Sequence, residues 1–132
     1  MGNISWKFYT PLKNENAIQE LEQKYGFKIS GNLRKIITEY NAGFPSPSTC
    51  KISEDFITDC KCLLSYNIDD PENIYDVIDY FSSRTHNRII PFASDSGSGY
   101  YGMKGPVVVY VDDELHPTTI AESLDSFFNS LY

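Results

Sequence analysis

An unbroken run of five apolar residues, Val107-Val108-Val109-Tyr110-Val111, constrains the fold of this chain more than any other segment. Its valines favour a strand, and a strand without polar side chains is typical of one that is buried on both faces. Two further short strands are predicted over residues 89–93 and 99–103. Because Pro91 cannot donate a backbone hydrogen bond, it indicates an edge or irregular strand. The sequence therefore predicts a central sheet.

Two helices are predicted in the first third of the chain, because apolar residues there recur on one face. The first begins at Asn16, which has capping-box spacing to Gln19, and ends before Gly26, a residue suited to a helix stop. The second begins after Ser30 and ends at residues 41–43, since the prolines that follow prevent its continuation.

Alternating side chains predict one strand over residues 49–64. A third helix is predicted from Asp70-Pro71, where an acidic cap precedes a proline. A last helix is predicted from about Ile120, with Thr119 and Glu122 spaced as a capping box. Residues 1–132 are therefore expected to form a single α+β domain: two N-terminal helices, a central mostly antiparallel β-sheet with one inserted helix, and a C-terminal helix.

The charge is unevenly distributed along the chain. The sequence has 11 Lys and Arg against 18 Asp and Glu, which gives a formal net charge of −7. Residues 1–66 carry 8 basic and 7 acidic side chains, whereas residues 67–132 carry 3 and 11. So few cations make direct binding to nucleic acid a poor interpretation. The acidic second half indicates either a surface for a basic partner or a means of staying soluble.

The segment Gly97-Ser98-Gly99-Tyr100-Tyr101-Gly102 matches the G-x-G-x-x-G pattern of dinucleotide-binding sites. That pattern needs a helix after the glycines, but here the sequence continues as strand. The favoured interpretation is a tight connection in which glycine supplies a positive φ, and no cofactor is expected. A small ligand-binding domain that uses this loop stays open as an alternative.

Neither a metal site nor a catalytic site is predicted. Cys60 and Cys62 are too close for the spacing of paired zinc ligands, and with Cys50 they are better interpreted as small buried hydrophobic residues. Either histidine, His86 or His116, can be paired with any cysteine on paper, which gives such a pairing no specificity.

A cytoplasmic location is expected. Residues 1–8 lack the basic and apolar stretches of a signal peptide, and nowhere do 18 apolar residues run together as in a membrane span. An odd number of cysteines, three, is simplest to explain by free thiols in a reducing compartment.

The acidic run Asp112-Asp113-Glu114 directly follows the buried valine strand. Like charges side by side must be exposed or paired. A solvated loop and a docking surface both satisfy that requirement, and the sequence leaves the two open.

Four ordered blocks of the sequence resemble the Smi/Knr-like SUKH superfamily. They are Ile18 to Gly43, with Tyr25-Gly26 and Tyr40-Asn41-Ala42-Gly43; Ile90-Pro91-Phe92-Ala93-Ser94-Asp95-Ser96-Gly97; Val109-Tyr110-Val111-Asp112-Asp113-Glu114; and Ile120 to Phe128. The chain departs from the family pattern at Ser30, where proline is usual, at Ala42, which replaces a glycine, and at Asp113, where histidine is frequent.

The resemblance implies an α+β domain without enzyme activity that acts by protein–protein binding. Bacterial members look like immunity proteins that neutralise a nuclease or other toxin, and fungal relatives are interaction proteins of cell-wall signalling. The leading hypothesis is therefore an immunity protein for a basic cognate toxin, and the alternative is a regulatory adaptor module. The expected partner-binding residues are Asp95, Tyr100, Tyr101, Asp112, Asp113 and Glu114. Because adjacent strand residues face opposite ways, only one of the two tyrosines is expected to be exposed.

Overall fold

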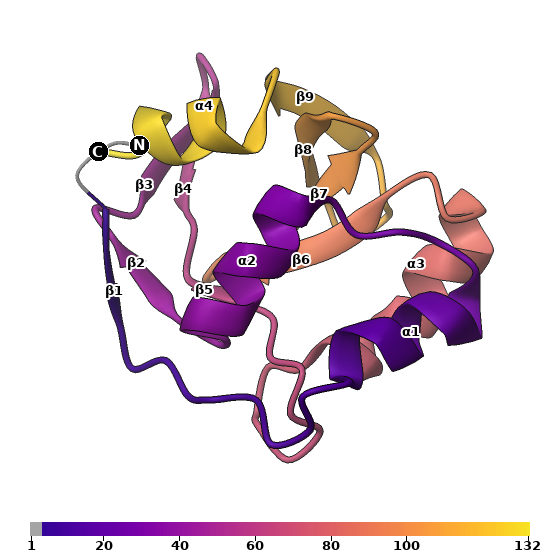
Figure 1. Cartoon of the computed structure of the whole chain (residues 1–132). Coiled ribbons are helices and arrows are strands. Elements are labelled where there is room, and N and C mark those ends of the chain that lie inside the picture. The colour runs from indigo at the N-terminus through magenta and orange to yellow at the C-terminus, as the bar shows by residue number, and fades with distance from the viewer. Residues whose placement is uncertain (1–3) are drawn as a thin grey trace.

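A five-stranded antiparallel sheet forms the centre of the computed structural model, which describes residues 4–132 (Figure 1). Its strands follow the chain in order: β5 (Cys62–Leu63), β6 (Ile90–Ser94), β7 (Tyr100–Lys104), β8 (Val107–Val111) and β9 (Pro117–Ala121). The valine run is β8, which lies between β7 and β9. Its Val108, Val109 and Val111 are fully buried, so the prediction of a strand covered on both faces is confirmed.

Each face of the sheet packs against a different set of helices. On one face, Tyr101 and Tyr110 belong to a large apolar core with residues of α1 (Ala17–Tyr25), α2 (Gly31–Tyr40) and α4 (Leu124–Ser130). On the other face, Val109 and Val111 form a smaller core with Phe81 of α3 (Ile78–Thr85). Phe81 thus brings α3 to the second face, next to the acidic turn that follows β8. The expected α+β class is confirmed.

The two N-terminal helices form where the sequence predicts them. Gly26 ends α1 in the left-handed conformation, with φ of 78°, and its N–H bonds to the carbonyl of Glu22. Ser30 caps α2, because its side chain accepts a hydrogen bond from the N–H of Leu33. The side chain of Asn16 makes no capping bond, so the predicted capping box of α1 is wrong.

The single strand predicted over residues 49–64 is wrong. The chain turns at Glu54-Asp55 and forms a hairpin of β3 (Thr49–Ser53) and β4 (Phe56–Asp59), and β5 follows separately. The alternation of side chains continues through both strands of a hairpin, so it does not reveal the turn. The hairpin lies next to α4 and the C-terminus, where Thr49 and Tyr132 exchange two backbone hydrogen bonds (Figure 1).

Two helix starts differ from the prediction. Asp70-Pro71 lies in a loop, and Asn73 instead caps the short 3-10 helix η1 (Ile74–Asp76), which α3 follows. Ile120 lies in β9, since residues 117–121 pair with β8, and the last helix is capped three residues later by Ser123. In both cases a nearby polar residue satisfies the helix N-terminus better than the one predicted.

Of the two interpretations of Pro91, the edge strand is wrong and the irregular strand is confirmed. Strand β6 pairs with β5 on one side and β7 on the other, and the register shifts between Pro91 and Ala93. The shift places the missing N–H of proline at an irregularity of the ladder. A further two-stranded pair, β1 (Ser5–Lys7) with β2 (Phe44–Ser46), has no counterpart among the predictions.

Candidate functional site

Asp95 follows the end of β6 and accepts four hydrogen bonds. Its Oδ1 accepts from the N–H groups of Gly97 and Gly99, both at 2.9 Å. Its Oδ2 accepts from Thr58 Oγ1 at 2.9 Å and from Tyr110 Oη at 2.7 Å. The residue is only 4% exposed. Asp95 therefore holds the glycine loop against the sheet, and it is not one of the surface carboxylates expected for a partner.

The glycines of residues 97–102 permit close approach and do not supply a positive φ. Within residues 4–132, the glycines with positive φ are Gly26 and Gly105, so that part of the prediction is wrong. A Cβ at Gly99 would lie 2.0 Å from Tyr110 Oη, and one at Gly102 would lie 2.6 Å from Ile89 Cγ2. The loop leads into β7, and its glycines make room for the Asp95–Tyr110 pair and for Ile89.

The two neighbouring tyrosines of β7 point to opposite faces, as expected. Tyr101 is fully buried, donates its Oη to the carbonyl of Asp59 at 2.8 Å, and packs on Phe127. Its ring belongs to the core, which removes it from the candidate contact surface. Tyr100 is half-buried, and the edge-to-face contact with Phe81 has a centroid distance of 5.7 Å.

Tyr100 lines a cleft with a volume of about 260 Å³ between α3 and the turn after β8. This cleft contains three of the predicted partner-binding residues, namely Tyr100, Asp112 and Asp113, and the exposed Glu114 continues the same turn. We call it the α3 cleft. Its lining residues are Asp76, Val77, Tyr80, Phe81, Ser98, Tyr100, Asp112, Asp113 and Leu115.

Four of these residues, Asp76, Val77, Tyr80 and Phe81, come from the inserted helical segment, and the site prediction missed them. Asp76 ends η1 and is exposed, and Tyr80, one turn further along, is 41% exposed. The available signal in the sequence was the spacing of Asp76 and Asp79, which puts two carboxylates on the outer face of a helix in this segment. The sequence did not indicate which other segment of the chain would lie next to this helix face. Packing of Phe81 onto Val109 and Val111 brings the two segments together.

The acidic turn is shaped by Asp112. Its Oδ1 accepts hydrogen bonds from the N–H groups of Glu114 at 2.9 Å and His116 at 2.8 Å. Leu115 has φ of 62°, which closes the turn. The hydrogen bond from the His116 N–H is the main cause that holds the pKa of the Asp112 carboxyl below its usual value of 3.8. Asp112 is therefore a carboxylate at neutral pH.

The negative charge of the α3 cleft has little compensation within the protein. Among residues 4–132, no Lys or Arg lies within ion-pair distance of Asp76, Asp112 or Asp113, and only the His116 Nδ1 approaches Asp112, at 3.3 Å. The pKa of Tyr100 is raised, first by burial and then by the nearby carboxylates, including Asp76. Both observations describe a partly apolar cleft in a negative electrostatic potential.

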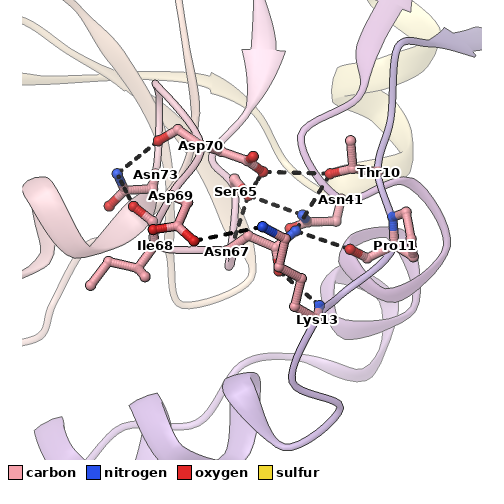
Figure 2. Close-up of polar contacts among 10 residues, drawn as sticks. All are labelled: Thr10, Pro11, Lys13, Asn41, Ser65, Asn67, Ile68, Asp69, Asp70 and Asn73. Atoms are coloured by element: carbon pink, nitrogen blue, oxygen red, sulfur yellow. Dashed lines mark hydrogen bonds and ion pairs between the residues drawn. The ribbon is translucent and has the colours of Figure 1, made fainter.

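A polar network ties three segments together, namely residues 10–13, Asn41 and residues 65–73 (Figure 2). The fully buried Asn41 donates from Nδ2 to Ser65 Oγ at 3.0 Å and accepts the N–H of Tyr66 at 2.8 Å. Asn67 accepts the N–H of Lys13 at 2.9 Å and donates to the carbonyl of Pro11 at the same distance. These groups satisfy one another's hydrogen bonds, so the network holds the segments together and is not a candidate binding site.

A second groove, with a volume of about 350 Å³, lies between α2, α4 and β1. Its walls include Trp6, which is stacked on Tyr40 at 5.5 Å and meets the ring of Phe128 edge-on at 5.4 Å. Its charged residues, among them Lys35 and Glu39, are of both signs. This groove lacks the uniform charge of the α3 cleft.

No group that could hold a metal ion, as three or more His, Cys, Asp and Glu side chains, exists in the part of the chain that the structure describes. The three cysteines are buried with free thiols, as predicted. Burial raises the pKa of the Cys62 thiol to about 11. The helices of the same part are all too short or too polar to cross a membrane.

Comparison with known proteins places the chain in one family. A search of the curated proteins finds none that matches. The sequence model of the SMI1 / KNR4 family (SUKH-1) matches residues 14–130, which include every helix and strand except β1, and the resemblance expected from the sequence is thereby confirmed. The chain belongs to the SMI1 / KNR4 family (SUKH-1).

Proposed function

We propose that this chain is an immunity-type protein that neutralises a cognate toxin by binding to it directly, and that the α3 cleft is part of the contact surface. Membership of the SMI1 / KNR4 family (SUKH-1) supports a protein-binding role. The observation that carries the proposal is the α3 cleft. Three carboxylates from two separate segments surround it, and none of them pairs with a Lys or Arg among the described residues.

A basic partner fits this surface on electrostatic grounds. A cleft that is lined by one sign of charge and has apolar walls focuses the field, which raises the association rate of an oppositely charged protein. Nuclease toxins fit this description, because a channel that holds nucleic acid phosphates must be basic. An inhibitor that docks there would cover the channel and block the substrate.

Co-expression with the toxin of a neighbouring gene tests the proposal. We expect the chain to restore growth that the toxin arrests, and the double variant Asp76→Asn/Asp113→Asn to restore it less. The matched control is Asp55→Asn/Glu122→Gln, which removes two exposed charges away from the α3 cleft, at the hairpin turn and beyond the far end of β9. Growth arrest that the unmodified chain does not relieve would contradict the proposed function.

A further inference from the structure

We propose that the α3 cleft binds an arginine side chain of the partner, with the guanidinium between the rim carboxylates and the aliphatic stem on the apolar floor. This inference rests on the proposed function, and it names the chemical group that the surface recognises. The shape, the charge and the aromatic residues of the cleft each support it.

The shape of the α3 cleft suits one long side chain. Its floor is apolar and consists of Val77, Phe81 and Leu115 together with the ring of Tyr100. Its rim carries the carboxylates of Asp76, Asp112 and Asp113. A volume of about 260 Å³ holds a side chain and leaves no room for a folded element. Arginine combines an apolar stem with a charged head, which is the same division of chemistry.

The carboxylates at the rim of the α3 cleft have few partners among the described residues, so they can pair with a cation of another molecule. Asp113 forms no hydrogen bond or ion pair with any side chain among residues 4–132, and Asp76 has only the amide of Asn73 as a side-chain partner. Both are exposed at the rim, so they can bond to an incoming group without moving core residues. A guanidinium can bind two carboxylate oxygens in one plane.

The aromatic residues favour arginine over lysine. The guanidinium carbon of the protein's own Arg84 lies 5.2 Å from the ring centre of Tyr80, a residue that lines the α3 cleft. This contact within α3 covers one face of the Tyr80 ring and shows the distance at which a guanidinium lies over a tyrosine of this protein. The planar group stacks on tyrosine, whereas an ammonium is more strongly hydrated and does not stack.

Titration of the isotope-labelled chain with three blocked peptides, followed by NMR, tests the inference. The peptides are glycine–arginine–glycine, glycine–lysine–glycine and glycine–citrulline–glycine; citrulline has nearly the shape of arginine but no charge. We expect the arginine peptide, with a dissociation constant on the order of 1 mM, to shift the signals of Val77, Tyr100 and Asp113. The lysine peptide should bind several-fold more weakly, and the citrulline peptide should leave these signals unchanged.

Two variants separate the α3 cleft from general charge attraction. Asp113→Asn should weaken binding of the arginine peptide at least threefold, whereas Asp55→Asn, an equal charge change at the exposed hairpin turn, should not. Equal shifts with all three peptides, shifts away from the cleft, or binding that survives Asp113→Asn would overturn the inference. So would the absence of any shift at peptide concentrations well above 1 mM.

The outcome is independent of the test of the proposed function. If the chain relieves the toxin but does not bind the arginine peptide, the inference falls and the proposed function stands. If it binds the peptide in the α3 cleft but does not relieve any toxin, the recognition of arginine stands and the proposed function falls.

Discussion

The Oη of Tyr110 donates a 2.7 Å hydrogen bond to Oδ2 of Asp95, and both residues are buried. The same carboxylate holds Gly97 and Gly99 through their N–H groups and Thr58 of β4 through its hydroxyl. It thus joins β8, the glycine loop and the β3–β4 hairpin at one point. Burial and the bond to Asp95 also raise the pKa of Tyr110 above its usual value of 10.0.

Tyr110→Phe should destabilise the protein by about 1.5–3 kcal/mol, the usual contribution of a hydrogen bond to a charged group. The ring remains in place, so its packing against Phe56 and Tyr101 is kept and the loss reports on the hydroxyl. Urea unfolding followed by circular dichroism measures the change. The control is Tyr9→Phe at a 49% exposed position, where a change within about 0.5 kcal/mol is expected. Equal effects of the two variants would refute a special role of the Asp95 bond.

Gly99→Ala should destabilise the protein by about 1–3 kcal/mol through overpacking, because the added Cβ would meet Tyr110 Oη at 2.0 Å. The matched control is Gly31→Ala in the first turn of α2, where a Cβ would have no atom within 4 Å. Alanine there should be neutral or stabilise by about 0.5–1 kcal/mol, because it restricts the unfolded chain. Thermal unfolding measures the stability of both variants. A Gly99→Ala protein as stable as the Gly31→Ala protein would show that the glycine loop accommodates a Cβ without cost and would contradict the prediction.

The prediction from sequence succeeded where one local cause determines the structure. The valine run was expected to be a buried strand because its β-branched valines favour extended backbone and none of its five residues is polar. Ser30 had to cap α2, since its hydroxyl lies at the start of a periodic apolar segment. In both cases, short-range physical chemistry and the final fold agree.

The prediction failed where distant segments decide. Residues 117–121 begin with a proline and precede a helix, and their pairing with β8 along the sheet makes them strand β9. Only one of the two segments that line the α3 cleft was predicted, for the same reason. The run from Asp112 to Glu114 is visible in the sequence, but Asp76 and Tyr80 join it only through the packing of α3 on the sheet.

Asn41→Ala should destabilise the protein by about 2–4 kcal/mol. The change leaves the buried N–H of Tyr66 without a partner, which costs about 1–3 kcal/mol. It also removes one hydrogen bond of the Ser65 hydroxyl, which keeps its bonds to Asp70 and to the N–H of Asn67, and a lost bond of this kind costs about 0.5–1.5 kcal/mol. Asn129→Ala, an exposed position in α4, is the matched control and should change stability little. The free energy of unfolding from urea titration measures both. A small loss for Asn41→Ala would mean that water replaces the amide in the network of Figure 2.

Glu22 should make stability depend on pH in the acid range. Burial alone would raise the pKa of its carboxyl, but the hydrogen bond from the Ile29 N–H, at 2.8 Å, and the contact with Arg34 outweigh burial and lower it below 4.5. The folded state therefore favours the charged form. The resulting stabilisation is complete above the unfolded pKa and is lost as the pH falls through the folded pKa.

Glu22→Gln removes this dependence. We expect the variant to be less stable than the original protein at pH 7 and the gap to narrow as the pH falls below about 4.5, in line with the lowered pKa. Urea unfolding at a series of pH values measures it. A gap that stays constant between neutral and acid pH would contradict the role of the carboxylate charge.

Association with the toxin should depend on the charge of the α3 cleft and on salt. In Asp76→Asn/Asp113→Asn, two of the three rim carboxylates become neutral amides of the same size. The association rate constant should fall about tenfold at low ionic strength, because long-range attraction guides the encounter. This loss in association rate should be smaller in 0.5 M salt. The Debye screening length is about 8 Å at physiological ionic strength and is shorter in 0.5 M salt, so the carboxylates attract the partner less there. Stopped-flow or surface plasmon resonance at several salt concentrations measures these rates. The Asp55→Asn/Glu122→Gln protein has the same net charge, so an equal loss there would mean that total charge, and not its position at the α3 cleft, steers the partner.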